Sequence, residues 1–217
     1  NEVCGMGPPS SGALTVGQIL GLLDRYDLAA MGPDSADAWR LIGENAAGDR
    51  VTLVLRDDKS GIQAGDEAFV LDPSQDLSSQ LFPADSGGFL VAMHLWRNIL
   101  IQGPAKFGDS VYVGRIPVKS GPPMEMLTAT RGVIECNLFF DDDRMLKRFE
   151  MFPDLDKDQC EVTFADYESI DGLSFPRTIR YQSGDFEAQT LKIERVEFLN
   201  KPSEGAVAIG VAEEASE

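Results

Sequence analysis

One run of residues in this chain could carry nucleophilic chemistry. Asp85-Ser86-Gly87-Gly88 places a serine in a glycine-rich turn, and such a serine is activated when a histidine base is hydrogen-bonded to it and an acid orients that histidine. The only histidine, His94, lies eight residues after Ser86, about two turns further along the same expected helix and out of hydrogen-bond reach. We therefore predict that Asp85 or Ser86 is the N-cap of that helix, and no catalytic residue is assigned.

Two acidic clusters have the residue types of a calcium site. Asp154, Asp156 and Asp158 alternate like the first ligands of a calcium loop, but a loop of that kind needs Gly at its sixth position and Glu at its twelfth. This chain has Gln159 and Ala165 there. A solvated hairpin turn is the expectation for this cluster and for the aspartates at 141–143, so no metal and no cofactor are predicted.

The three cysteines, Cys4, Cys136 and Cys160, are too few and too scattered to indicate a disulfide framework or a zinc site. Cys136 and Cys160 fall on expected strands that a third strand separates, which puts them about 9 to 10 Å apart. Because a disulfide reaches only about 7 Å between Cα atoms, we expect buried free thiols.

The elements that would position these residues are mostly strands. After Asn45 the apolar residues recur at every second position between short turns. Turns this short join antiparallel neighbours, since a parallel crossover needs a dozen or more residues. One face of the sheet is expected to be apolar and the other polar. The expected strands are 50–56, 67–71, 110–118, 124–130, 133–141, 145–152, 160–167, 173–181 and 186–198.

The last strand shows a break in its alternation. The apolar phase moves from Leu191 and Ile193 to Val196 and Phe198, which predicts a β-bulge at residues 194–195 and a local bend. Bending of this kind lets a sheet curl into a partial barrel.

One long helix is predicted, from Ser86 to about Gln102. Apolar residues cover most of its circumference and leave His94, Arg97 and Asn98 as a narrow polar stripe, so the helix is expected to lie in the concavity of the curved sheet. On such a stripe His94 is expected to be a surface or hydrogen-bonded residue rather than a base or a ligand.

The concavity around this helix is a candidate ligand-binding site. An apolar hollow with few polar groups suits a lipid-like ligand, although the apolar residues that line it could simply be core. The candidate ligand-binding residues are Phe89, Met93, Trp96, Leu138, Phe140, Val162 and Phe164.

The first segment has helical rather than strand periodicity. Thr15 with Gln18 forms a capping box that opens a helix over 15–23, and a second short helix is predicted from Ser35 or Asp37 to Ile42. The run Cys4-Gly-Met-Gly-Pro-Pro-Ser-Ser-Gly-Ala-Leu-Thr-Val-Gly-Gln-Ile-Leu-Gly-Leu-Leu23, with 38–44, resembles the large subunit of γ-glutamyltransferases (glutathione hydrolases). That family's nucleophile is a threonine in a Thr-Thr-His motif, which this chain lacks, so the resemblance implies at most an inactive fragment.

A second resemblance covers about two-thirds of the chain. Gly65-Asp-Glu-Ala-Phe-Val-Leu-Asp72, Leu138-Phe-Phe-Asp-Asp-Asp143, Asp166-Tyr-Glu-Ser-Ile-Asp-Gly-Leu-Ser-Phe-Pro176 and Gln189-Thr-Leu-Lys-Ile-Glu-Arg-Val-Glu-Phe198 are similar to the periplasmic lipoprotein-carrier (lipoprotein localisation factor) family. The resemblance implies an unclosed barrel around helices, an acyl chain as the ligand, and a periplasmic or secreted location.

Composition limits the possible partners. The 217 residues are 43% hydrophobic and 25% charged, with 36 acidic against 19 basic side chains and a net charge of -17, which disfavours nucleic acid and anionic lipid headgroups as partners. No run approaches the roughly 18 apolar residues of a membrane span. Because the chain begins at Asn1 with neither Met nor an apolar leader, we expect it to be part of a longer multidomain protein.

Together these patterns predict an α+β fold, a curved antiparallel sheet wrapped on a long apolar helix. We expect a helical segment at 1–45, a half-barrel domain at 46–200 and a disordered acidic tail at 201–217. The predicted function is a non-catalytic extracytoplasmic module that binds an apolar ligand or lipoprotein acyl chain, or an accessory domain of a larger secreted protein. The γ-glutamyltransferase fragment is the alternative.

Overall fold

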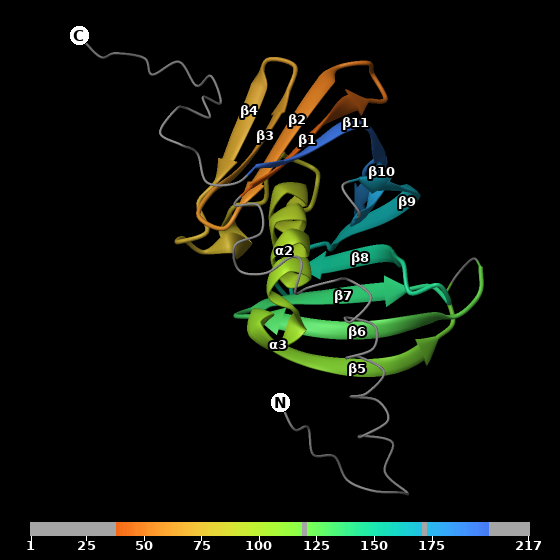
Figure 1. The fold of residues 1–217 in the computed structure, drawn as a ribbon. Helices are drawn as coiled ribbons and strands as arrows, with labels where there is room; N and C mark the ends of the chain where they lie inside the picture. Colours follow the sequence, from red (N-terminus) through yellow and green to blue (C-terminus); the bar gives the residue numbers. More distant parts are fainter. Residues whose placement is uncertain (1–37, 119–120, 171–172, 200–217) are drawn as a thin grey trace, which may run out of the picture.

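The fold is dominated by a single antiparallel sheet. The structure is a computed structural model that describes residues 38–118, 121–170 and 173–199. Within these residues eleven strands form the continuous order β4-β3-β2-β1-β11-β10-β9-β8-β7-β6-β5 (Figure 1). The strands are β1 Ala38–Asn45, β2 Arg50–Arg56, β3 Ser60–Ala64, β4 Glu67–Leu71, β5 Asp109–Ile116, β6 Met124–Arg131, β7 Ile134–Phe140, β8 Leu146–Phe152, β9 Cys160–Ile170, β10 Leu173–Ser183 and β11 Gln189–Leu199.

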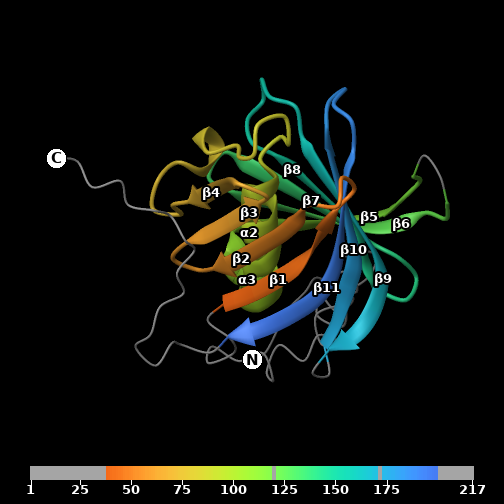
Figure 2. The ribbon, with the colours of Figure 1, turned by 90° about the horizontal axis from the view of Figure 1, so that it is seen from above.

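The sheet consists of two runs of consecutive hairpins. Strands β1 to β4 form one run and β5 to β11 the other, and they join where β1 pairs with β11 in antiparallel register. The strands β4 and β5 stay at the two free edges, so the sheet is an unclosed half-barrel. Its curvature leaves a hollow that holds the helix α2, Phe89–Gln102 (Figures 1 and 2).

The helix α2 is surrounded by the sheet. It contacts β2 and β3 on one side and β8 and β9 on the other, and every residue from Phe89 to Ile99 is buried. The predicted N-cap, Asp85 or Ser86, is wrong, because α2 begins at Phe89 and its N-cap is Gly88. The hydroxyl of Ser86 nevertheless accepts hydrogen bonds from the backbone N–H groups of Gly88 and Phe89, at 3.3 and 3.0 Å, and so satisfies donors at the start of the helix. Two shorter helices, η1 (Leu77–Ser79) and α3 (Pro104–Phe107), flank α2 in the sequence.

The alternating pattern of the strands determines which side chains form the core. Ile134, Cys136, Leu138 and Phe140 of β7 are buried, as are Cys160, Val162 and Phe164 of β9, which confirms the predicted apolar face. Cys136 and Cys160 are free and buried. Both are opposite Met151 of β8, so the expected intervening strand is present. Burial raises the pKa of both thiols, so they are unreactive packing residues.

The predicted bulge is confirmed. Ile42 of β1 is opposite Arg195 and Gly43 is opposite Ile193, so Glu194 is the extra residue in β11. This register shift explains why the apolar phase of the last strand changes between Ile193 and Val196.

The helix predicted to end at Ile42 is wrong. Residues Ala38 to Asn45 form a strand where a helix ending at Ile42 was predicted. The short run Trp39 to Ile42 fits both a helical and a strand periodicity. It forms a strand because its backbone pairs with β2 on one side and β11 on the other. Within the described residues the fold is therefore mostly sheet with one long helix, which agrees with the predicted half-barrel wrapped on a helix. The helix predicted at 15–23, Cys4 and the tail at 201–217 lie outside the described residues.

Candidate ligand-binding cavity

A small apolar cavity lies between α2 and the strands β8, β9 and β10. Its volume is about 30 Å³. Trp39, Trp96, Leu146 and Phe175 form its buried wall, whereas Tyr167 is half-buried. Leu100, Leu173, Ser174 and Pro176 complete the lining. Because Leu100, Leu173 and Tyr167 are half-buried and Ser174 is exposed, this end of the cavity forms a mouth at the surface.

Aromatic rings build the wall of the cavity. Trp96 of α2 stacks on Phe164 with ring centroids 5.0 Å apart and meets Trp39 of β1 edge to face at 5.4 Å. Phe175 of β10 contacts Trp39 and Trp96 edge to face, each at 5.6 Å. These are the favoured geometries for aromatic pairs. The wall thus combines side chains from both hairpin runs and from the helix, and it exists only when β1 and β10 are brought together.

One polar atom in this wall lacks a partner. The indole Nε1 of Trp96 is buried and has no hydrogen-bond partner among the described residues. By contrast, the Tyr167 hydroxyl donates to the backbone carbonyl of Leu146. A buried N–H without an acceptor is costly, about 1 to 3 kcal/mol. An acceptor oxygen within hydrogen-bond reach of this N–H would remove that cost.

The structure places all seven predicted ligand-binding residues in one core, but only Trp96 lines this cavity. The other six fill the hollow of the half-barrel with their own side chains, at 7% exposure or less: Phe89, Met93, Leu138, Phe140, Val162 and Phe164. Sequence reasoning missed Trp39 because it was assigned to a helix, and it missed Phe175 and Tyr167. The last two lie in the Asp166 to Pro176 motif, which is the signal that could have found them.

A buried polar cluster ties α2 to the first hairpins. His94 Nδ1 lies 3.0 Å from the hydroxyl of Ser60 in β3, and His94 Nε2 lies 2.9 Å from the amide nitrogen of Asn98. All three are at most 2% exposed. Because the Asn98 amide donates to Nε2, the proton of neutral His94 sits on Nδ1 and is donated to Ser60.

This cluster is structural rather than catalytic. Ser60 also accepts from the Arg56 N–H and donates to the Arg56 carbonyl, at 3.2 and 3.3 Å, and it is 1% exposed, so no substrate reaches its hydroxyl. Burial, together with the positive charges of Arg131 and Arg97, lowers the pKa of His94 from 6.5 to about 4. His94 is therefore neutral at physiological pH. The predicted polar stripe exists, but it faces the interior.

Arg97 provides a second link between α2 and the sheet. Its Nη1 lies 2.5 Å from Asp57 in the turn between β2 and β3, and its guanidinium lies 5.8 Å from the centroid of the Trp39 ring. This ion pair holds the helix in the register that presents Trp96 to the cavity.

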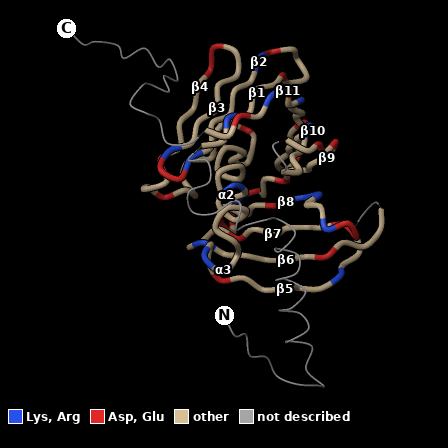
Figure 3. The backbone as a smooth tube through the Cα atoms, in the orientation of Figure 1, with Lys and Arg blue, Asp and Glu red and all other residues tan. Residues whose placement is uncertain are grey.

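The acidic clusters occupy turns. Residues 141–143 lie between β7 and β8, and residues 154–158 between β8 and β9. In the described ranges no group of three or more His, Cys, Asp or Glu side chains could hold a metal ion. Figure 3 shows charged residues mainly along the strands of the sheet and in its turns, and Arg97 is the only charged residue of α2.

Solved structures share this fold. A LolA superfamily protein from Nitrosomonas europaea superposes with a TM-score of 0.50 at 12% identity, over 85% of this chain and 94% of that one. A DUF1329 family protein from Desulfovibrio piger gives a TM-score of 0.45 at 12% identity, over 85% of this chain and 93% of that one. The sequence matches no protein-family model and no curated protein.

The first likeness defines the class of fold. The chain has a LolA-like unclosed half-barrel, so the resemblance to lipoprotein carriers is supported at the level of the fold. The resemblance of the first segment to γ-glutamyltransferases is not supported. No helix among the described residues is long and apolar enough to cross a membrane.

Proposed function

We propose that this protein is a non-catalytic, carrier-like module that binds an apolar ligand, such as a lipid or a lipoprotein acyl chain, between α2 and the sheet. The observation that carries this proposal is the aromatic cavity with the unpartnered Nε1 of Trp96 in its wall. An acyl ester has the matching chemistry, since a long hydrocarbon chain would occupy the hollow and its carbonyl oxygen would accept from Trp96.

The size of the cavity implies a closed state. At about 30 Å³ it is far below the roughly 300 Å³ or more of ligand pockets. Entry of an acyl chain therefore requires the half-buried mouth residues Leu100, Tyr167 and Leu173 to move apart. Opening at this edge leaves the central sheet intact, because these residues lie near the ends of α2, β9 and β10.

The LolA-like fold supports the proposal as an analogy of architecture. An extracytoplasmic location, periplasmic or secreted, is part of the same proposal. The module could act alone or as an accessory domain of a longer secreted protein.

Titration with a fluorescent long-chain acyl ester tests this function. We expect saturable uptake at a one-to-one ratio, and we expect Trp96→Phe to weaken ester binding roughly fivefold because it removes a hydrogen bond of about 1 kcal/mol. A hydrocarbon probe of the same length should bind both proteins equally. Phe186→Ala is the matched control, because Phe186 is 49% exposed and does not line the cavity. Absence of uptake by the unmodified protein would refute the proposed function.

A further inference from the structure

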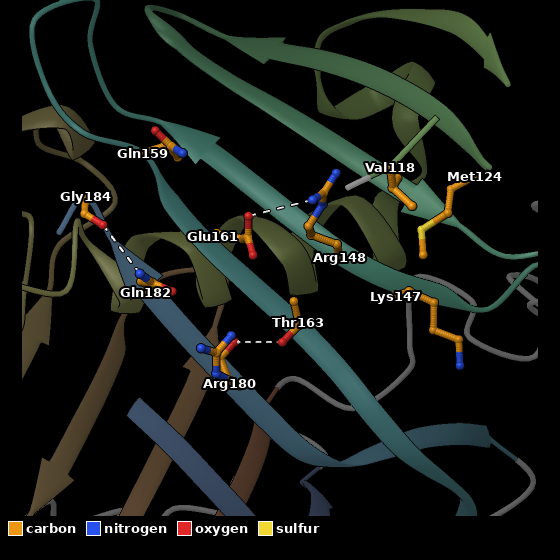
Figure 4. Close-up of a pocket in the computed structure, with 10 residues that line it drawn as sticks. All are labelled: Val118, Met124, Lys147, Arg148, Gln159, Glu161, Thr163, Arg180, Gln182 and Gly184. Carbon is orange, nitrogen blue, oxygen red and sulfur yellow. Dashed lines mark hydrogen bonds and ion pairs between the residues drawn. The ribbon is translucent and has the colours of Figure 1, made fainter. Parts of the chain in front are cut away.

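A second and larger hollow lies on the other face of the sheet. It is a groove of about 550 Å³, within the usual range of small-molecule sites. Its floor is formed by β8, β9 and β10, and Val118 and Met124 border one end (Figure 4). The sheet separates it from the inner cavity, since the residues that alternate with its lining, such as Phe149 and Val162, are buried in the core. The groove is therefore independent of the proposed acyl site.

Strand register arranges the polar side chains of the groove in two parallel rows. In the first row Thr163 of β9 lies opposite Arg148 of β8 on one side and Arg180 of β10 on the other. In the second row Glu161 lies between Glu150 and Gln182. Rows of directly opposed residues on one face place these side chains within reach of a single small ligand.

One end of the groove has an excess of negative charge. Glu150 and Glu161 face each other, and Arg148 is the cation that pairs with both, at 3.3 and 3.8 Å. Arg148 is held there, because its guanidinium also lies 4.0 Å from the centroid of the Phe139 ring. Burial raises the pKa of Glu150, Arg148 opposes that rise and the charge of Glu161 adds to it. The neighbouring Lys147 is engaged elsewhere, 3.3 Å from Asp141.

The other end of the groove has a cation without an anion. Arg180 is exposed, and its guanidinium makes no hydrogen bond or ion pair with any described residue. The contact that Arg180 does make uses its backbone carbonyl, which accepts from the Thr163 hydroxyl at 3.4 Å. Arg180 is therefore a cation of the groove that remains available to an anionic group.

The two ends are close together. Glu161 and Arg180 are diagonal neighbours across β9 and β10, a relation that puts their Cα atoms about 7 to 8 Å apart. They do not pair with each other, because Glu161 turns toward Arg148 (Figure 4). A ligand whose own charges are separated by a few bonds fits between them.

We propose that this outer groove binds a small zwitterion, with its ammonium group at Glu161, where the neighbouring carboxylate of Glu150 adds negative charge, and its carboxylate or phosphate at Arg180. The amides of Gln159 and Gln182 line the same groove and supply further hydrogen bonds. Phosphoethanolamine has this chemistry, either free in solution or as a lipid headgroup.

Calorimetric titration with phosphoethanolamine tests the proposal. Arg180→Gln and Glu161→Gln should each weaken binding at least tenfold, and ethanolamine or inorganic phosphate alone should bind at least tenfold more weakly than the zwitterion. Arg177→Gln is the matched control on the same strand, because Arg177 pairs with Glu168 at 2.8 Å and lies outside the groove. Circular dichroism verifies that each variant is folded.

Three results would decide against the site. Failure of phosphoethanolamine to bind at millimolar concentration overturns it, and so does equal binding of inorganic phosphate. Unchanged affinity in both Arg180→Gln and Glu161→Gln also overturns it.

Vesicles of phosphatidylethanolamine then distinguish the two sources of the ligand. Binding to both the vesicles and the free compound assigns a lipid headgroup, whereas binding to the free compound alone assigns a soluble ligand. Acyl-ester uptake should be unchanged in Arg180→Gln, so the two proposals fail separately.

Discussion

The surroundings of His94 keep this residue neutral in the folded protein. It is completely buried between Ser60 and Asn98, and its pKa is lowered to about 4. Protonation would place a second donor at Nε2, against the donating amide of Asn98. His94 is therefore neutral in the folded protein, whereas in the unfolded chain the same side chain becomes protonated near pH 6.5.

This difference sets the sign of a pH dependence. Between pH 6.5 and about 4 the unfolded chain holds more protons at this site, so stability is fully present above this window and is lost as the pH falls through it. The expected slope is up to about 1.4 kcal/mol per pH unit. Urea unfolding across this window measures it, with His94→Gln as the comparison.

His94→Gln should be less stable at pH 7 by about 1 to 3 kcal/mol because the buried hydrogen bonds are disturbed, yet it should show a flatter pH profile than the unmodified protein. Identical profiles for the two proteins between pH 4 and 6.5 would contradict the assignment of neutral, buried His94.

The sequence predicted the polar stripe of α2 correctly. It could not show that β2 and β3 cover this stripe, because the position of these strands depends on pairing elsewhere in the sheet.

At the scale of elements, the junction of β1 and β11 is the critical contact. At this junction the bulge at Glu194 meets Gly43, where an added Cβ would lie 2.0 Å from the carbonyl oxygen of Lys192. Only glycine allows the two backbones to approach this closely. The two hairpin runs are therefore joined at a position that tolerates no side chain.

Gly43→Ala should reduce the free energy of unfolding by about 2 to 3 kcal/mol, since the strands must separate locally to admit the methyl group. Gly65→Ala is the control. Gly65 lies in the turn between β3 and β4 with nothing within 4 Å of a built Cβ, and its φ is +56°, so that change costs only about 1 kcal/mol of backbone strain. Urea midpoints measure both. Equal losses would show that the close approach at Gly43 is not a constraint.

Element prediction succeeded where the local pattern was unambiguous. The strand Arg50–Arg56 and the strand Glu67–Leu71 were predicted with their observed bounds, because both have clear turns at their ends. The strand β3 was missed since Ser60 to Ala64 has only one large apolar residue, Ile62. The strand β1 was taken for a helix because four residues with two possible periods cannot separate the two structures.

At the scale of the whole molecule, the cavity depends on long-range pairing. Trp39 and Phe198 are directly opposite in β1 and β11, and their contact brings the first described strand next to the last. Short turns predict that strands adjacent in the sequence pair with each other. The local pattern therefore predicts the hairpins, but it does not predict the long-range pairing of β1 with β11. For the same reason the sequence predicted an apolar hollow around Trp96 but not that Trp39 and Phe175 form its wall.

The whole molecule also offers an internal reporter. The chain has two tryptophans, and both line the cavity. Quenching of their emission by a group on a bound ligand therefore reports that the group has come close to the proposed site.

Quenching of this emission by a dibrominated long-chain acyl ester tests the central claim most directly, because bromine quenches only on close approach. We predict saturable quenching of both tryptophans at a one-to-one ratio, no quenching by the unbrominated ester, and competition between the two. Binding of the brominated ester without quenching would place the acyl chain outside the space between α2 and the sheet and would contradict the account.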